Sequence, residues 1–435
     1  MKEFFKKTFY NQFFKVFSFN GIIVVGKLIT SFIVSKVSAI YLGPSGYAIV
    51  GNLKNILQGV LGVTANGFES GLIKYIAENK ENKNQFSSIV SSALTLSICL
   101  SLFVGFFLFV FSNQLSVFIL KDASLTYIFR YLSIFLPLIS LNFLVVYIVN
   151  GLQKFRLYTL LISITNVLNA VITFFLVYFF SLKGALMASI LIPVLSFIFS
   201  ILIKDVRIFF GDAITNLKTI SVSFLRSIFT YIVMAIYSTI LLSLSYLLIR
   251  NNIISFIDTS TAGLWEAMNK LSSFYMIFFS SLFTLYLLPL LASNKTIKGY
   301  AEIMSTYFKY LIPFIIVLFL GILFFRVLLI KLFLTNEFLK IEQFFYLQLF
   351  GDFIKIIAFS FAYQFHAKKM VIPYFITDAI LYVSFYLLSM HWLKYHHLQG
   401  VFYAYIVSTL LYLITVCLFV FSNRTKHLKS ENQFI

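Results

Sequence analysis

Long apolar runs recur along the whole chain and constrain its fold more than any other feature. A helix needs about 20 consecutive apolar residues to cross the hydrocarbon core of a bilayer. The sequence holds twelve such stretches: 17–41, 47–73, 86–111, 125–150, 158–181, 184–203, 224–249, 262–291, 310–334, 342–365, 371–392 and 400–422. They are apolar on all sides and longer than the alternating strands of about ten residues in a membrane barrel. They predict an all-α integral membrane protein with twelve transmembrane helices.

The composition excludes a water-soluble enzyme. Of the 435 residues, 60% are hydrophobic and 11% are charged, whereas an ordinary soluble domain carries about 25% charged residues. The connections between the spans are short and leave no room for an extramembrane domain. We find no nucleophile with a partnered base, no phosphate-binding glycine loop and no metal-ligand cluster. We therefore expect no catalytic residues, no metal and no cofactor.

The net charge of +19 is explained mainly by topology. If the N-terminus is cytoplasmic, the inner segments hold 21 Lys and Arg residues and the outer segments hold 6, with Arg250 counted among the outer ones. This excess satisfies the positive-inside rule and predicts that both termini are cytoplasmic. Nucleic acid is therefore not an expected partner.

The two halves of the sequence contain related segments. At an offset of 217, residues 46–52 align with 263–269, so that Asn52 matches Asn269; at an offset of 216, residues 184–188 align with 400–404. Because six spans per half is an even number, both halves keep the same orientation and are related by an axis along the membrane normal. We expect a central cavity between an N-terminal six-helix lobe (1–203) and a C-terminal six-helix lobe with a short cytoplasmic tail (224–435), joined by a cytoplasmic linker (204–223).

Three lysines lie inside spans of the N-terminal half without a local partner: Lys27, Lys36 and Lys54. A charge at the centre of a membrane helix costs about 3 kcal/mol on the insertion scale, so such residues face water, a partner or a ligand. Lys36 is nearer a helix end and also suits snorkelling to the interface. As a group these lysines predict an anion site in the cavity.

Acidic residues within the spans allow two interpretations. Glu266 and Lys270 are four residues apart, and Asp352 and Lys355 are three apart, so each couple shares a helix face and can form a neutral packing pair. The carboxyl groups can instead bind protons and couple protonation to conformation; the candidates are Asp352, Glu266 and Asp378. The remaining expected polar residues of the cavity are Asn52, Glu69, Asn269, Lys270 and Lys355.

Motifs spread over most of the chain carry a family resemblance. They are Leu42-Gly-Pro-Ser-Gly46 followed by Asn52 and Lys54, Lys74-Tyr-Ile-Ala77, Lys183-Gly-Ala-Leu186 with Ile192-Pro193, Gly263-Leu-Trp265, Tyr286-Leu-Leu-Pro289, and Gln348-Leu-Phe-Gly-Asp352 with Lys355. In order and spacing the chain resembles the Wzx-type translocases of O-antigen and other polysaccharide units, most closely the branch of the enterobacterial common antigen lipid III flippase. That family belongs to the multidrug/oligosaccharidyl-lipid/polysaccharide exporter (MOP) superfamily, which has two six-helix lobes in a V shape.

The resemblance implies a flippase of the bacterial inner membrane that acts in lipopolysaccharide or other polysaccharide biosynthesis. Its substrate would be an undecaprenyl-diphosphate-linked oligosaccharide, moved from the cytoplasmic to the periplasmic leaflet by alternating access among membrane lipids. Lys27, Lys36 and Lys54 would then bind the diphosphate. A polysaccharide polymerase and a chain-length regulator are partners that the resemblance implies. Glu69 and Glu266 depart from the family pattern, which is consistent with a different sugar.

The same residues leave two other functions to compare with the flippase. A proton- or cation-coupled small-molecule or drug antiporter of the same superfamily is the main alternative, although an exporter of cationic drugs is expected to have an acidic cavity. A membrane sugar polymerase or ligase is disfavoured because the outer connections are short.

Overall fold

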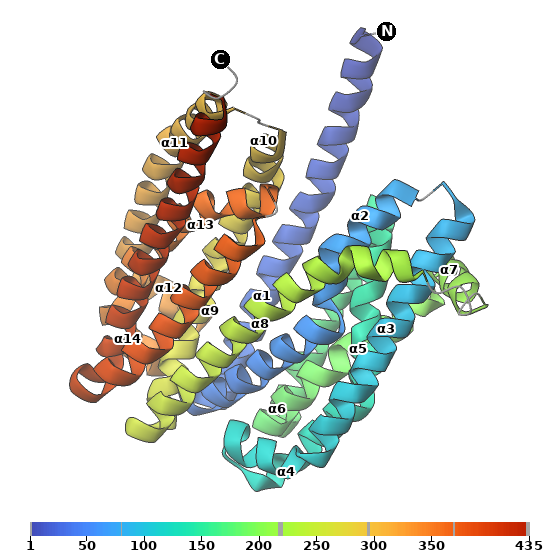
Figure 1. Cartoon of the computed structure of the whole chain (residues 1–435). Coiled ribbons are helices and arrows are strands. Elements are labelled where there is room, and N and C mark those ends of the chain that lie inside the picture. Colours follow the sequence, from blue (N-terminus) through green and yellow to red (C-terminus); the bar gives the residue numbers. More distant parts are fainter. Residues whose placement is uncertain (1, 80, 216–220, 294–295, 369, 432–435) are drawn as a thin grey trace. The chain divides into compact units, whose positions relative to one another are not determined.

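The chain is helical almost throughout in the computed structural model, which describes residues 2–79, 81–215, 221–293, 296–368 and 370–431 (Figure 1). Eight helices in these ranges are long and apolar enough to cross a membrane. Large hydrophobic side chains stand out on their surfaces; Phe179 is 67% exposed, Val317 71% and Phe324 78%. Extended surfaces of this kind are not stable in water. The prediction of an all-α membrane protein is therefore confirmed.

Three of the longest helices each contain one residue at which the backbone leaves the helical conformation. These residues are Gly43 (φ 60°), Ser181 (φ 45°) and His397 (φ 50°). Gly43 and His397 fall in connections that the sequence predicts between consecutive spans, and Ser181 is the last residue of the predicted span 158–181. The helices concerned are α1 (Lys2–Thr64), α6 (Phe155–Leu202) and α14 (Val371–Glu431).

The breaks in α6 and α14 have the same local geometry. A glycine follows each break by three residues, Gly184 in α6 and Gly400 in α14. A Cβ atom on Gly184 would lie 1.8 Å from the carbonyl oxygen of Leu176, and one on Gly400 would lie 2.4 Å from the carbonyl oxygen of Trp392. In both turns that carbonyl belongs to the residue eight positions earlier. The offset of 216 found in the sequence thus relates two turns that are built alike.

Met1–Leu42 and Asn52–Ile240 form one compact unit, called unit 1 below. Within it α5 packs against both α3 and α6, and α2 packs against α5. The core joins these helices through buried side chains that include Phe68, Leu72, Ile76, Val90, Leu144, Ile148, Phe197 and Ile228. The elements of unit 1 besides α1 and α6 are η1 (Asn66–Phe68), α2 (Glu69–Asn79), α3 (Lys83–Val110), α4 (Ser112–Leu115), the π-helical segment η2 (Ser116–Leu120), η3 (Ala123–Leu125), α5 (Thr126–Gly151), α7 (Lys204–Thr215) and the first part of α8 (Val222–Phe256).

Buried hydroxyl groups connect three helices inside unit 1. The Ser97 hydroxyl on α3 donates to the backbone oxygen of Thr64 (2.5 Å), and Ser140 on α5 donates to the Thr64 hydroxyl (2.8 Å). Ser101 on α3 donates in turn to Ser140 (2.9 Å). Thr64 is the last residue of α1 before the 3₁₀ segment η1, where the helix ladder ends. The hydroxyls thus provide hydrogen-bond partners at a helix end that has little access to water.

The stretch expected as a linker, 204–223, begins with α7, and residues 216–220 lie outside the described residues. Val206, Phe209 and Phe210 are buried in the core of unit 1. The Lys154 ammonium donates a hydrogen bond to the Asp205 carboxylate (2.8 Å). This hydrogen bond and the positive charge of Lys154 lower the pKa of the Asp205 carboxyl. The first part of this stretch is therefore a packed helix.

Gly43–Gly51 and Leu241–Ile435 form a second compact unit, unit 2. Its core is rich in aromatic residues, including Phe279, Phe283, Tyr300, Tyr307, Phe365 and Tyr412. Within it α13 packs against α14. Unit 2 contains the last part of α8 and the whole of α14. Its other elements are α9 (Thr259–Leu282), the π-helical segment η4 (Phe283–Leu287), α10 (Leu288–Ser293), α11 (Ile297–Phe324), α12 (Arg326–Phe333), the 3₁₀ segment η5 (Asn336–Phe344) and α13 (Phe345–Ala367).

We predict that Gly184→Ala and Gly400→Ala each destabilise the protein by about 2 kcal/mol or more, because the added methyl group collides with backbone rather than with a flexible side chain. Thermal unfolding of the purified protein in detergent measures the effect. Gly321→Ala is the matched control, since a Cβ there meets nothing within 4 Å and alanine favours a helix by about 1 kcal/mol over glycine. Equal melting temperatures for all three variants would contradict the steric argument.

Candidate functional site

The Asp352 carboxylate of unit 2 accepts hydrogen bonds from four side chains. It lies on α13 and is 1% exposed. Its Oδ2 accepts hydrogen bonds from Ser272 (2.7 Å), from Gln348 (3.0 Å) and from the Tyr275 hydroxyl, while Oδ1 accepts one from the Tyr405 hydroxyl (2.6 Å). The donors come from α9, α13 and α14. The four donors satisfy the hydrogen-bonding needs of a carboxylate that has no access to water.

Lys355 lies one helical turn beyond Asp352 and is half-buried. Its ammonium group is 5.5 Å from the ring centroids of Phe359 and Tyr405, in cation–π geometry. Tyr405 therefore contacts both charged residues, donating its hydroxyl to Asp352 and presenting its ring to Lys355. The structure brings together the two residues that the sequence placed on one helix face, and it adds an aromatic side chain from α14.

A second charged group in unit 2 centres on Arg250, which is 1% exposed. It forms an ion pair with Glu266, and its guanidinium lies 5.5 Å from the ring centroid of Trp265. Gly51 faces this pair so closely that a Cβ there would lie 2.7 Å from Cδ of Glu266. Sequence reasoning counted Arg250 as a charge of an outer connection because the apolar run ends at residue 249. In the structure α8 continues to Phe256, so this arginine is a buried helix residue.

The remaining sequence candidates of unit 2 have different surroundings. The ammonium of Lys270 lies 5.5 Å from the ring centroid of Phe274. The amide nitrogen of Asn269 is buried and has no hydrogen-bond partner among the described residues. Asp378 is 7% exposed, and its charge acts on the hydroxyls of Tyr382 and Tyr412.

Unit 1 holds the three predicted diphosphate ligands, all on α1. Lys27 and Lys54 are exposed on this unit and Lys36 is half-buried. Lys27 interacts electrostatically with Glu69, which begins α2 and is also exposed. Two lysines in an apolar helix thus keep their ammonium groups accessible instead of packing in the core.

Asn52 has a structural role that the sequence did not reveal. It is fully buried, and its side-chain amide donates to the backbone oxygen of Ile119 (2.7 Å) in the π-helical segment η2. A π-helix leaves carbonyl groups without their regular partners, so a buried amide beside it is stabilising. This bond ties α1 to η2.

Comparison with known proteins places the chain in a family. Residues 15–295 match the family described as polysaccharide biosynthesis protein. The chain belongs to this family. It is also 21% identical over 397 residues to the lipid III flippase of Escherichia coli strain K12. This alignment covers 90% of this chain and 94% of that protein. These matches confirm the resemblance to the Wzx-type translocases.

Solved structures show the same fold. A multidrug resistance MATE family transporter of the MOP superfamily, in an inward-facing conformation, superimposes with a TM-score of 0.72 at 16% identity, covering 93% of this chain and 96% of that one. The lipid II flippase MurJ, in an inward closed conformation, superimposes with a TM-score of 0.70 at 17% identity, covering 94% of this chain and 87% of MurJ. The chain therefore shares the fold of the MOP superfamily.

We predict that Tyr405→Phe destabilises the protein by about 2 kcal/mol, because it removes a hydrogen bond to a buried carboxylate while it keeps the ring over Lys355. Thermal unfolding in detergent measures the loss. Tyr310→Phe, at a side chain that is 70% exposed, is the matched control and should leave the melting temperature unchanged. If both variants have the melting temperature of the parent protein, the hydrogen bond from the Tyr405 hydroxyl to Asp352 does not stabilise the fold.

Proposed function

We propose that the chain is a flippase that moves an undecaprenyl-diphosphate-linked oligosaccharide unit from the cytoplasmic to the periplasmic leaflet of a bacterial inner membrane. The observation that carries the proposal is the nearly full-length similarity to a lipid III flippase, together with exposed lysines on an apolar helix of unit 1. The transferred unit would then be consumed by a polysaccharide polymerase working with a chain-length regulator.

The lysines fit the central difficulty of this reaction. A diphosphate carries charge that hydrocarbon does not solvate, so a carrier must replace its water with protein cations or dipoles. Ammonium groups are strong phosphate ligands. We therefore assign Lys27, Lys36 and Lys54 to the diphosphate. The sugars would follow in polar surroundings, and the polyprenyl chain would remain in the lipid.

The arrangement we propose is twelve crossings in two six-helix lobes with both termini in the cytoplasm, alternating in access around a central cavity. Two observations support it. The breaks at Gly43, Ser181 and His397 divide three long helices at or next to predicted connections, and the alike turns at Gly184 and Gly400 agree with a duplicated six-helix repeat.

The transport proposal predicts that Lys27→Ala combined with Lys54→Ala abolishes surface polysaccharide in a flippase-null strain, because the diphosphate loses its ligands. The polysaccharide is measured by gel and the protein level by immunoblot of membranes. Lys27→Arg with Lys54→Arg should retain function. Lys121→Ala with Lys183→Ala, at two other exposed lysines of unit 1, is the matched control. Full complementation by the first double variant would remove the proposed diphosphate site.

We also propose that Asp352 couples transport to protons, with Glu266 and Asp378 as secondary candidates. The support is that the Asp352 carboxylate is buried and held by side chains of three helices, so protonation must change at least one of their hydrogen bonds. Glu266 already forms an ion pair with Arg250.

Proton coupling predicts that a pH gradient accelerates transport of lipid-linked units into protected leaflets of proteoliposomes, and that Asp352→Asn removes this acceleration. Asp122→Asn, at an exposed N-cap residue, is the control and should respond like the parent protein. A normal response of Asp352→Asn to the gradient would exclude the role. Proton flux with organic cations but none with lipid-linked sugars would instead support the antiporter function.

A further inference from the structure

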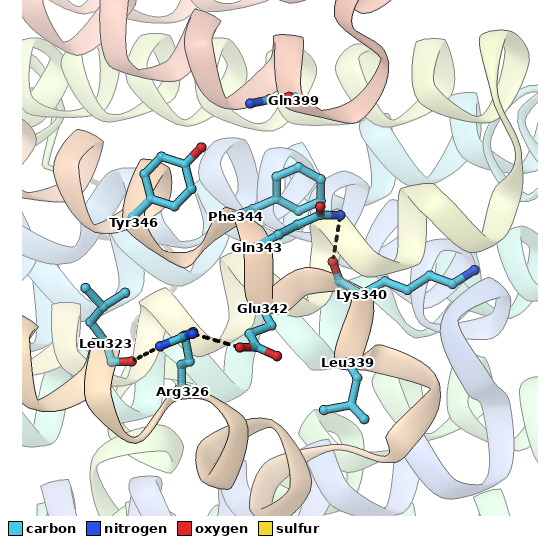
Figure 2. A pocket seen from close by; sticks show the side chains of 9 residues that line it. All are labelled: Leu323, Arg326, Leu339, Lys340, Glu342, Gln343, Phe344, Tyr346 and Gln399. Atoms are coloured by element: carbon cyan, nitrogen blue, oxygen red, sulfur yellow. Dashed lines mark hydrogen bonds and ion pairs between the residues drawn. The ribbon is translucent and has the colours of Figure 1, made fainter.

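A cavity of about 770 Å³ lies in unit 2 at one end of its helices. Ligand pockets in proteins usually measure about 300–1,000 Å³, so this one has room for a small ligand. Figure 2 shows Arg326 and Glu342 on one side of it and Tyr346 and Gln399 on the other. The lining residues come from α11, α12, η5, α13 and the part of α14 that follows its break: Leu323, Arg326, Leu339, Lys340, Glu342, Gln343, Phe344, Tyr346 and Gln399.

The polar side chains of this cavity are held in place by hydrogen bonds to the protein. Arg326 donates to Glu342 (2.8 Å) and to the backbone oxygen of Leu323 (2.9 Å). Gln343 donates to the backbone oxygen of Lys340 (3.2 Å). Such fixed side chains lose little entropy when a ligand binds, which favours affinity.

The second glutamine is fixed in the same way. Gln399 follows the break at His397 and donates to the hydroxyl of Tyr403 (2.8 Å). In both glutamines the bond uses the amide nitrogen, and an amide oxygen has two lone pairs for a further partner. A carboxylate likewise accepts up to about four hydrogen bonds, so Glu342 retains acceptor capacity beyond its bond with Arg326. The cavity therefore offers acceptors and donors side by side.

This polar lining contrasts with the surface around it. Phe324 is 78% exposed, Leu328 58% and Phe350 54%, as expected of side chains that face lipid. The Arg326–Glu342 pair alone is explained by its bonds within the fold. Two glutamines, a lysine and a tyrosine lie beside that pair, so six polar side chains line the cavity.

The chemistry of the lining selects among ligands. A phosphate is bound best by several cations, but here Arg326 is already paired with Glu342. A sugar ring presents hydroxyls that both donate and accept, and C–H faces that pack on aromatic rings. The glutamines, the Arg–Glu pair and the ring of Tyr346, which is 52% exposed, match those features.

We propose that this cavity binds sugar residues of the oligosaccharide at the end of unit 2 that the charge pattern assigns to the outer side. The inference rests on the proposed function and adds a glycan-binding site to it. Sugars that have crossed the membrane would bind there while the diphosphate remains with the lysines or has left them. The site would select for the glycan and not for its lipid anchor.

The test uses the full chain in lipid nanodiscs and, as probe, the oligosaccharide released by mild acid from lipid-linked units of the cell that encodes it. Calorimetric titration should show binding to the parent protein and a Kd about tenfold higher for Gln343→Ala combined with Gln399→Ala, because two hydrogen bonds to the sugar are lost. Gln114→Ala, at an exposed glutamine of unit 1, is the matched control and should bind like the parent protein.

Three results would overturn the inference: no binding to the parent protein, equal binding by the double variant, or displacement of the sugar by glycerol phosphate, which would indicate a lipid headgroup site. A transport assay in proteoliposomes separates this failure from that of the proposed function. If the parent protein moves lipid-linked units and yet binds no free glycan, the cavity assignment alone is wrong. If it moves none, the proposed function is wrong.

Discussion

Hydrocarbon offers no hydrogen-bond partners, and this constraint decides where the polar groups of the chain can lie. Helices satisfy the backbone, but polar side chains at membrane depth must find partners on other helices. The hydroxyls around Thr64 do so in unit 1, and the four donors around Asp352 do so in unit 2. Because lipid tails are as apolar as leucine, apolar contact alone does little to fix helix positions in a membrane. These polar contacts therefore determine which helices pack together and how each is positioned along its neighbour.

The breaks in α6 and α14 show one solution to a turn within a short connection. A non-glycine residue takes a positive φ, Ser181 in one case and His397 in the other. Such a sparsely populated conformation costs about 1–3 kcal/mol. The glycine three residues later has no Cβ atom that would collide with the carbonyl of the preceding helix. An identical solution at an offset of 216 is hard to obtain from two unrelated turns, so it favours duplication of an ancestral half.

Much of the fold could be predicted because each membrane helix is recognised from its own run of apolar residues. The ends of the apolar runs locate the breaks near residues 43, 181 and 397, and glycines mark the close approaches. Asp352 stood out as a charge inside an apolar run, and its donor Gln348 lies four residues earlier on the same helix, in the motif that contains both. The donors Ser272 and Tyr405 did not stand out, because only the packing of α9 and α14 against α13 brings them to the carboxylate.

The two charged groups of unit 2 are joined by aromatic packing. Four rings form a continuous path in which neighbouring centroids lie 5.4–5.7 Å apart: Trp265, Tyr246, Phe385 and Tyr405. Trp265 lies against Arg250 at one end, and Tyr405 donates to Asp352 at the other. Aromatic rings are rigid, so a rotation of Tyr405 displaces its neighbours instead of being absorbed by them.

The proposed protonation of Asp352 would act on this path through its hydrogen bonds. A protonated carboxyl becomes a donor and loses acceptor capacity, so at least one of its four hydrogen bonds must break or reverse its direction. Tyr405 is the donor on Oδ1, and it is also the last ring of the path. The Arg250–Glu266 pair at the far end packs against Gly51 with no room for a methyl group. On the proposal that Asp352 binds a proton, its protonation would change the packing of the rings between Tyr405 and the Arg250–Glu266 pair.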